Sequence, residues 1–257
     1  MSKVFITGST DGLGFATARL LIEQGHQVIG HARNAQRADD LRASLPAIWE
    51  VVTGDLGAIE QTLSVADQVN ALGRCDAVIH NAGIGYREPR RNPTADGHAR
   101  VLAVNVLAPY LLTILIERPD RLVYLSSGMH RGGTASVADL DWKNRPWSGA
   151  QAYSDSKLFD TVVAFAVARK WSDVLSNSVD PGWVPTKMGG RGASDDLSQA
   201  HLTQAWLAVG EDPGARVSGE HFYHLRPRAV NPAARSKEFQ DELVAALAEL
   251  TGVAFPE

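Results

Sequence analysis

The chain has 257 residues, 44% of them hydrophobic and 21% charged, so it is long enough for one sizeable α/β core. Its formal net charge of −4 gives no electrostatic footprint for nucleic acid or an anionic membrane, and we expect neither partner. No signal peptide precedes the strand-like run at Lys3, and no stretch approaches the roughly 20 apolar residues that span a bilayer, so a cytoplasmic location is expected.

Short apolar runs alternate with helix-length amphipathic segments along the whole chain. Strands are expected at 3–7, 27–31, 48–52, 77–80, 121–126, 174–179 and 220–225. Helices are expected at 13–24, 35–45, 57–72, 96–116, 152–170, 194–208 and 236–250. This alternation predicts an α/β fold of Rossmann type, a doubly wound parallel sheet of about seven strands with helices on both faces.

No linker or repeat divides the chain, so a single NAD(P)-binding domain over residues 1–257 is expected. Two irregular stretches, 128–151 and 184–200, follow expected strands. Sites in such sheets lie at the carboxyl ends of the strands, and long loops there shape them. We expect both stretches to border the substrate.

The first strand leads into the glycine-rich run TGSTDGLG at 7–14, which is followed by a helical pattern. Glycines there permit a tight turn and let backbone approach a pyrophosphate at a helix N-terminus, whose dipole favours anions. A strand before the run and a helix after it favour a dinucleotide site over a turn of purely structural use.

The end of the second strand indicates which dinucleotide binds. Folds that prefer NAD usually carry an acid there, whereas here Ala32 stands at that place and Arg33 follows. An arginine binds a 2′-phosphate well, and no carboxylate opposes it. We therefore predict NADP(H); the alternative is that Arg33 is an ordinary solvated loop charge.

Tyr153 and Lys157, in AYSDSKL at 152–158, lie four residues apart and share one face of a helix. A free tyrosine has a pKa of about 10, so it is a poor base at neutral pH. A cation one turn away favours the phenolate and lowers that pKa, which would let Tyr153 donate or accept a proton. The alternative is an incidental surface pair worth a few tenths of a kcal/mol.

Taken in order, the motifs resemble those of the classical short-chain dehydrogenase/reductase family. Besides the glycine-rich run they include VLAVNVLAPYLL around Asn105, the Tyr153–Lys157 pair, and PGWVPT at 181–186. ADLDW at 138–142 and the tail RSKEFQDELVAALAELTG are similar to the branch with retinol dehydrogenases and protochlorophyllide reductases. We do not transfer the substrates of that branch.

The resemblance implies a role for each matching residue. Asp55 and Leu56 would border the adenine, and Thr186 would hold the nicotinamide carboxamide. The implied catalytic set is Asn105, Ser127, Tyr153 and Lys157. The implied cofactor residues are Gly8, Ser9, Thr10, Gly12, Leu13, Gly14, Arg33, Asp55, Leu56, Asn81, Ala82, Gly83, Tyr153, Lys157, Pro181, Gly182, Val184 and Thr186.

Two of these assignments carry a further structural expectation. Ser126 and Ser127 are adjacent, so strand alternation sends their side chains to opposite faces and only one serves; the family pattern favours Ser127. Asn105 lies in the middle of an expected helix, where an asparagine side chain competes with the backbone for hydrogen bonds and is unfavourable. The family resemblance implies that Asn105 marks a kink in this helix, and that a water held there connects Lys157 to solvent as a proton path.

Other residues have open roles. The aromatic residues of the two loops could line an apolar pocket or pack the loops onto the domain, and the basic and histidine side chains could meet substrate or simply face solvent. The single cysteine, Cys75, is expected in the core, and without thiolate or histidine spacing no metal is expected. The candidates for substrate contact are Trp142, Trp147, Trp183, His130, Arg87, Arg90 and Arg91.

The sequence therefore predicts an NADP(H)-dependent oxidoreductase that interconverts a small-molecule carbonyl and an alcohol. A catalytically silent NADP(H)-binding regulator and an epimerase or dehydratase are the alternatives. The intact tyrosine and lysine disfavour the first, and the short chain disfavours the second. Helices 96–116 and 152–170 are apolar on more than one side. This pattern is compatible with a homodimer or homotetramer interface, and equally with burial of both helices in the core.

Overall fold

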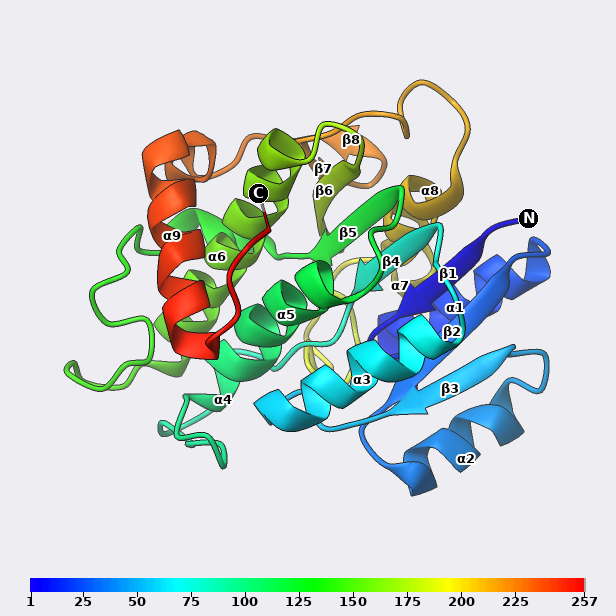
Figure 1. Ribbon diagram of the computed structural model, residues 1–257, viewed down its shortest axis with the longest axis horizontal. Coiled ribbons are helices and arrows are strands. Elements are labelled where there is room, and N and C mark those ends of the chain that lie inside the picture. The colour runs from blue at the N-terminus through cyan, green and yellow to red at the C-terminus, as the bar shows by residue number, and fades with distance from the viewer. Residues whose placement is uncertain (257) are drawn as a thin grey trace.

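The computed structural model describes residues 1–256 and contains one eight-stranded sheet. The strands are β1 (Lys3–Ile6), β2 (Gln27–Ala32), β3 (Glu50–Thr53), β4 (Ala77–His80), β5 (Arg121–Leu125), β6 (Leu175–Asp180), β7 (His221–Tyr223) and β8 (Arg226–Pro227). Their order is β3-β2-β1-β4-β5-β6-β7-β8, and each pair is parallel except β7 with β8 (Figure 1).

Helices cover both faces of this sheet. The α-helices are α1 (Gly12–Glu23), α2 (Ala35–Ser44), α3 (Ile59–Ala71), α4 (Arg100–Leu102), α5 (Ala108–Leu115), α6 (Gly149–Lys170), α7 (Leu197–Ala200), α8 (Leu202–Val209) and α9 (Lys237–Thr251). Three shorter segments are the π-helical η1 (Ala103–Leu107) and the 3₁₀-helical η2 (Gly128–Gly132) and η3 (Pro232–Arg235).

The core has two parts, one on each face of the sheet. Side chains of α3, α5, α6 and α9 form one hydrophobic cluster, and those of α1, α2 and α8 form the other. Figure 1 shows α3, α5 and α6 side by side in front of the sheet, with α9 packed on α6. The predicted doubly wound α/β fold is confirmed, and Cys75 is fully buried as expected.

The run 220–225, expected as one strand, is instead a hairpin. Tyr223 pairs with Arg226, so only His224 and Leu225 form the loop. Their φ angles are +47° and +62°, the conformation of a two-residue turn that joins antiparallel strands. Such turns usually contain asparagine or glycine, and because neither is present here the sequence did not indicate the turn.

The long helix expected at 96–116 begins later and is not uniform. Pro93 and Ala99 form an isolated bridge, and Gly97 has a φ of +83°, so the chain turns back before helix starts at Arg100. From there α4, η1 and α5 follow one another directly. The π-helical turn η1 therefore lies in the middle of a continuous helical stretch.

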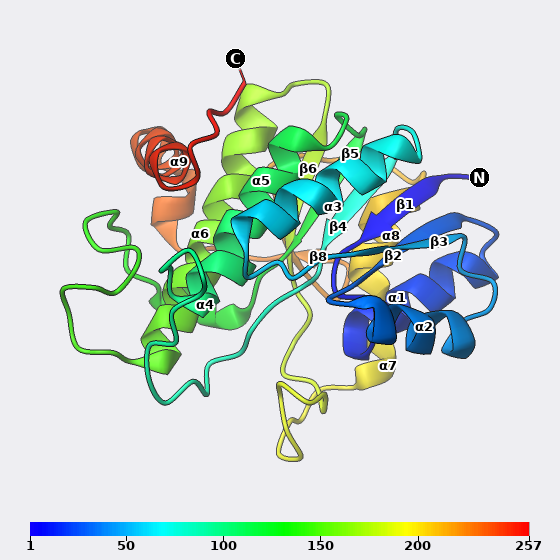
Figure 2. The ribbon, with the colours of Figure 1, turned by 60° about the horizontal axis from the view of Figure 1, so that its bottom comes forward.

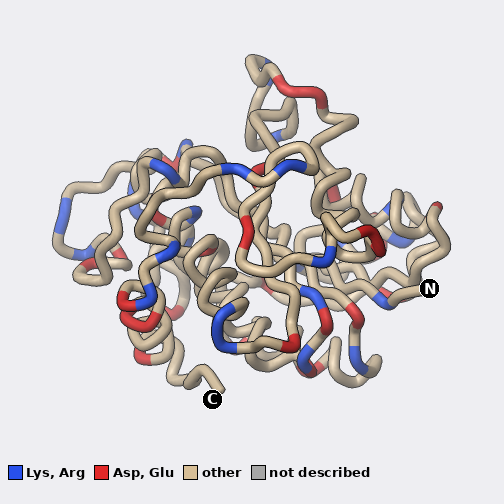
Figure 3. The backbone as a smooth tube through the Cα atoms, turned by 90° about the horizontal axis from the view of Figure 1, so that it is seen from above, with Lys and Arg blue, Asp and Glu red and all other residues tan. Residues whose placement is uncertain are grey.

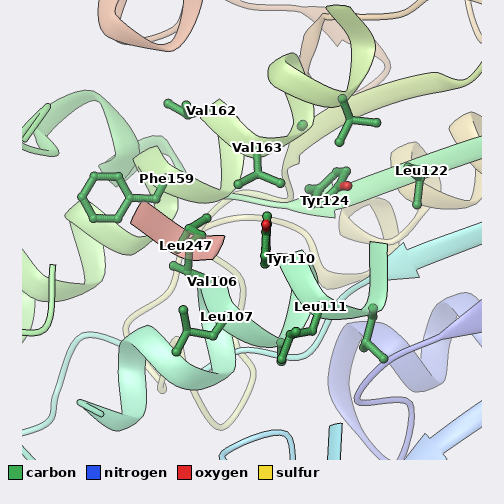
Figure 4. Close-up of a cluster of buried hydrophobic side chains, with 14 of the residues drawn as sticks. Val106, Leu107, Tyr110, Leu111, Leu122, Tyr124, Phe159, Val162, Val163 and Leu247 are labelled. Carbon is green, nitrogen blue, oxygen red and sulfur yellow. The ribbon is translucent and has the colours of Figure 1, made fainter. Parts of the chain in front are cut away.

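Helix α6 is buried on nearly all sides. Every residue from Ala152 to Val167 is buried, because α6 packs on β5 and β6 and is covered from outside by α9. Figure 4 shows Phe159, Val162 and Val163 of α6 among side chains of α5 and α9. Among the residues described, no helix is long and apolar enough to cross a membrane.

The segments that follow β4, β5 and β6 project from the same end of the sheet, towards the left and bottom of Figure 2. This is the end where the parallel strands have their carboxyl termini. The two stretches expected to border a site, 128–151 and 184–200, belong to these segments.

Candidate active site

The glycine-rich turn between β1 and α1 is held against the end of β4. The side-chain amide of Asn81 donates to the carbonyl oxygens of Thr7 (2.9 Å) and Gly8 (3.1 Å). Gly8 has a φ of +63°, in the region that favours glycine. A methyl group placed at Gly14 would lie 2.4 Å from the Gly8 carbonyl oxygen. Only glycine therefore lets the first turn of α1 pack this closely on the loop.

His31, which the sequence analysis did not single out, connects this turn to the end of β3. The Gly8 N–H donates to His31 Nδ1 (3.0 Å), so Nε2 carries the hydrogen and donates to the Gly54 carbonyl (2.9 Å). Burial lowers the pKa of His31 to about 4. The ring is neutral at physiological pH, and its two hydrogen bonds fix the glycine-rich turn.

A cavity of about 650 Å³ opens at the carboxyl ends of the strands, beside the N-terminus of α1. Free backbone N–H groups and the helix dipole favour phosphate at such a place. Most of the predicted cofactor residues line it, namely Gly8, Thr10, Gly12, Leu13, Arg33, Asp55, Leu56, Asn81, Ala82, Gly83 and Thr186. The lining does not include Ser9, Gly14, Pro181, Gly182, Val184, Tyr153 and Lys157.

Charged side chains gather at one corner of this cavity. Arg37 donates to Thr10 Oγ1 (2.7 Å) and to Asp11 Oδ2 (3.0 Å), and Lys187 donates to the same carboxylate (2.7 Å). All four side chains line the cavity, as does Arg33. Elsewhere Lys and Arg are interspersed with Asp and Glu along the chain (Figure 3). The corner is rich in cations, which suits an anionic ligand.

Asn105 is fully buried in the π-helical segment η1. Its Oδ1 accepts from the Ile84 N–H (2.8 Å), while Nδ2 donates to the Ile84 carbonyl (3.1 Å) and to Ser156 Oγ (3.0 Å). A π-helical turn interrupts the regular hydrogen bonds of an α-helix. The distortion thus occurs at the residue for which the resemblance implies a kink, and the amide ties the segment after β4 to α6.

Ser127, at the end of β5, accepts from the Met129 N–H at its Oγ (3.3 Å) and lies close enough to the Tyr153 phenol to lower its pKa. Ser126 turns the other way: its Oγ donates to the Lys157 carbonyl (2.9 Å) and accepts from Thr161 Oγ1 (2.9 Å). Strand alternation therefore places only Ser127 beside the tyrosine. His130 is fully buried, and its Nδ1 donates to the Ser127 carbonyl (2.6 Å), so it supports the serine from behind.

The pKa of Tyr153 moves opposite to the direction that the sequence suggested. Burial raises it to about 12, and the carboxylates of Asp180 and Asp160 add to the rise, whereas a hydrogen bond with Ser127 lowers it. The phenol is therefore protonated at neutral pH. Any lowering of this pKa has to come from a bound ligand or from a rearrangement of Lys157.

The ammonium of Lys157 is held beneath the cavity wall. Its Nζ donates to the Leu125 carbonyl and lies 3.4 Å from Asp160 Oδ2. A methyl group placed at Gly83 would lie 3.8 Å from this Nζ and 3.6 Å from Asn105 Oδ1. Because Gly83 lines the cavity, Lys157 and Asn105 lie directly behind its wall.

The segment after β6 borders the cavity from the opposite side. Met188 lines the cavity and packs on Gly85, where a methyl group would lie 2.6 Å from Met188 Cγ. Trp183 is 48% exposed, and its Nε1 donates to the Gly189 carbonyl (3.2 Å), which also accepts from Arg87 (3.2 Å). Trp183 and Arg87 therefore meet at Gly189, directly after the cavity-lining Met188.

The other aromatic and basic candidates pack loops together. Trp142 is 6% exposed and contacts Trp147 edge-to-face at 5.5 Å between ring centroids. Trp147 Nε1 donates to the Glu88 carbonyl (2.9 Å). Arg91 pairs with the buried Asp141 at 3.0 Å. These contacts connect the 128–151 loop to the segment after β4, whereas Arg90 donates to its neighbour Asn92 (3.3 Å).

Comparison with known proteins identifies the family. Residues 2–196 match the family model described as short chain dehydrogenase. The chain belongs to the short-chain dehydrogenase/reductase family. An uncharacterized oxidoreductase of Emericella nidulans is 41% identical over 260 residues, covering 100% of this chain and 99% of that protein. Human retinol dehydrogenase 13 is 28% identical over 285 residues, covering 98% of this chain and 85% of that protein.

A solved structure extends this result to the fold. The crystal structure of a protein from Mycobacterium Paratuberculosis has a TM-score of 0.87 to this chain at 26% identity, covering 100% of this chain and 96% of that one. The predicted resemblance to short-chain dehydrogenases, including their retinol dehydrogenase branch, is confirmed. Membership of this oxidoreductase family supports a nicotinamide cofactor, and the cavity at the glycine-rich turn fits one.

Several residues of this short-chain dehydrogenase site were missed by sequence reasoning. Arg37 follows Arg33 by four residues, in the first turn of the helix expected at 35–45, so its nearness in sequence was a usable signal. Asp160 likewise lies one turn beyond Lys157. Lys187 and Met188 gave no signal, because they reach the cavity only through the path of a loop.

Proposed function

We propose that the protein transfers a hydride between NADP(H) and a small-molecule carbonyl or alcohol, with Tyr153 as general acid and base. The observation that carries this proposal is that Lys157 lies behind the wall of a cavity at the glycine-rich turn, on the same helix as Tyr153, which Ser127 neighbours. A nicotinamide cofactor, when bound, supplies or accepts the hydride. The chain's own residues supply the proton and the hydrogen bonds.

In carbonyl reduction, negative charge develops on the substrate oxygen. The Ser127 hydroxyl donates a hydrogen bond to that oxygen, and the Tyr153 hydroxyl donates its proton. The raised pKa of Tyr153 keeps that proton in place at neutral pH. Lys157 Nζ, which lies 3.4 Å from Asp160 Oδ2, would ease the ionisation that follows once it turns towards the phenol, and Asn105 holds the adjoining loop.

The preference for NADP(H) rests on the charges at the end of β2. Ala32 is buried and Arg33 lines the cavity directly after it. Arg37, four residues further in the first turn of α2, lines the same corner. Guanidinium groups bind phosphate oxygens in a planar, paired geometry, so the two arginines suit a 2′-phosphate.

A panel of ketones, aldehydes and secondary alcohols, followed through NADPH absorbance, tests the reaction. Tyr153→Phe should bind NADPH with unchanged Kd yet lose turnover by about 10²-fold or more, because the proton donor is gone. Tyr110→Phe is the matched control, since Tyr110 is buried and its hydroxyl donates to the Val253 carbonyl (2.9 Å), away from the cavity lining. Retained turnover in Tyr153→Phe would contradict the mechanism.

The same substrate panel separates the alternative functions. A regulator would bind NADPH without turnover, and an epimerase would convert substrate without net cofactor change.

The cofactor preference is tested with Arg33→Ala in the same assay. Loss of a guanidinium–phosphate contact should raise KM for NADPH by about tenfold and leave KM for NADH nearly unchanged. The same NADPH preference in the wild type and the variant would show that Arg33 does not bind the 2′-phosphate.

A further inference from the structure

Asp160 is a buried carboxylate beside the proposed proton-transfer groups. Its side chain is 2% exposed, and the residue follows Lys157 by three positions and Tyr153 by seven. In an α-helix this spacing places all three residues on one face of α6. Two ionisable groups of that face belong to the proposed mechanism, and the third has no role in it.

The contacts of Asp160 show an incompletely matched charge. Its Oδ2 lies 3.4 Å from Lys157 Nζ, while Oδ1 is buried without a hydrogen-bond partner among the residues described. Burial raises the pKa of Asp160 to about 7, against the lowering effect of Lys157. A buried carboxylate of this kind is costly unless a nearby cation compensates it.

Other titratable groups facing this region come from neighbouring strands. Tyr124 of β5 points between α5 and α6 (Figure 4), and its hydroxyl lies 2.7 Å from Thr113 Oγ1, which in turn lies 3.1 Å from His80 Nε2. Burial raises the pKa of Tyr124, and the Asp160 carboxylate adds to that effect. Asp180 of β6 acts on Tyr153 in the same direction. Lys157 is the cation that faces Asp160.

We propose that Asp160 is a positioning residue that offsets the charge of Lys157 and thereby extends to higher pH the range in which Tyr153 stays protonated. Its carboxylate draws Nζ towards itself and opposes a second negative charge on the phenol. Both effects make phenolate harder to form. This inference rests on the proposed function, because it assigns Tyr153 the part of proton donor.

The pH dependence of carbonyl reduction in Asp160→Asn tests this role. Asparagine keeps the shape and removes the charge, so the alkaline loss of kcat/KM should begin about one pH unit lower than in the wild type. Asp155→Asn is the matched control, because Asp155 is 1% exposed on the same helix but pairs with Arg145 at 2.9 Å. Its midpoint should equal that of the wild type. A purely structural role for Asp160 would change the midpoint of thermal unfolding without moving the pH profile.

A second measurement does not depend on turnover. The tyrosinate absorbance of each protein, minus that of its Tyr153→Phe counterpart, reports the titration of Tyr153 alone. Its midpoint should be lower in the Asp160→Asn background, and Asp160→Ser replaces that variant if it does not fold. An unchanged midpoint overturns the inference whatever the turnover. A lowered midpoint in a protein that reduces no carbonyl supports the electrostatic role and refutes the proposed function.

Discussion

Ion pairs lie at two places around the cavity; one pair is exposed to solvent and the other is buried. In the cationic corner, the side chains of Arg37 and Asp11 are 38% and 48% exposed. On α6, those of Lys157 and Asp160 are 5% and 2% exposed. Water screens the first pair, so it contributes at most about 1 kcal/mol, whereas the second cannot lose one partner without leaving a buried charge. The exposed corner is therefore suited to selecting a charged ligand, and the buried pair to setting proton affinities.

Lys157→Met should give the largest effect. It leaves Asp160 buried without its cation, which costs roughly 3 kcal/mol or more of unfolding free energy at pH 8. The pKa of Asp160, already raised to about 7 by burial, rises further. A raised folded-state pKa means that the folded protein holds a proton which the unfolded chain releases, so stability falls as pH rises above about 4. Urea unfolding should therefore show a much smaller loss at pH 5.5 than at pH 8.

Two variants sharpen this result. Lys157→Met with Asp160→Asn removes both charges and should recover most of the lost stability. Arg37→Met removes one partner of the exposed pair and should change the unfolding free energy by less than about 1 kcal/mol. If Lys157→Met were no less stable than Arg37→Met, the contrast between the two places would be wrong.

The cationic corner has its own buried polar group, His31, and its contribution should depend on pH. His31→Asn removes the contacts to Gly8 and Gly54, so it should lower the unfolding free energy by about 2 kcal/mol at pH 7.5. Burial lowers the folded-state pKa of His31 to about 4 from a usual value of 6.5. The contribution of the ring is thus complete above pH 6.5 and is lost as pH falls towards 4.

Wild type and His31→Asn should therefore converge in stability on acidification. Asp160 makes the unfolding free energy depend on pH in the opposite direction. This contribution is the same in the wild type and in His31→Asn, so it cancels when the two unfolding free energies are subtracted. A difference in unfolding free energy that stays constant between pH 7.5 and 4.5 would show that His31 is not held neutral by burial.

The sequence predicted the parts of this molecule whose local pattern decides their structure. TGSTDGLG allows few alternatives to a close strand–helix turn, as the fit of Gly14 against Gly8 shows. The Tyr153–Lys157 spacing on one helix was readable for the same reason. Strand ends were off by one or two residues, and the 224–225 turn was missed because its residues are uncommon in the left-handed conformation.

The features that could not be predicted from the sequence are those that depend on which side chains the fold buries. Asp160 looks like any helical aspartate until β5 and α9 enclose α6. The direction of the pKa shift of Tyr153 was mispredicted because spacing revealed the nearby cation but neither the surrounding apolar atoms nor the carboxylate that shares that cation. The role of Lys187 required the path of the loop after β6.

The smallest predicted effect belongs to Asp11, whose carboxylate accepts from both Arg37 and Lys187 in the cationic corner. Asp11→Asn should change the unfolding free energy by less than about 0.5 kcal/mol, since the pair is exposed. It should lower the Kd for NADPH a few-fold in dilute buffer, because a like charge near the proposed 2′-phosphate is gone and two cations are released. The gain should vanish at roughly 1 M salt, where the screening length is about 3 Å. Calorimetry with NADPH and NADH separates the causes: an equal gain for NADH would place Asp11 away from the 2′-phosphate, and weaker NADPH binding would mean that Asp11 instead holds Arg37 in its binding position.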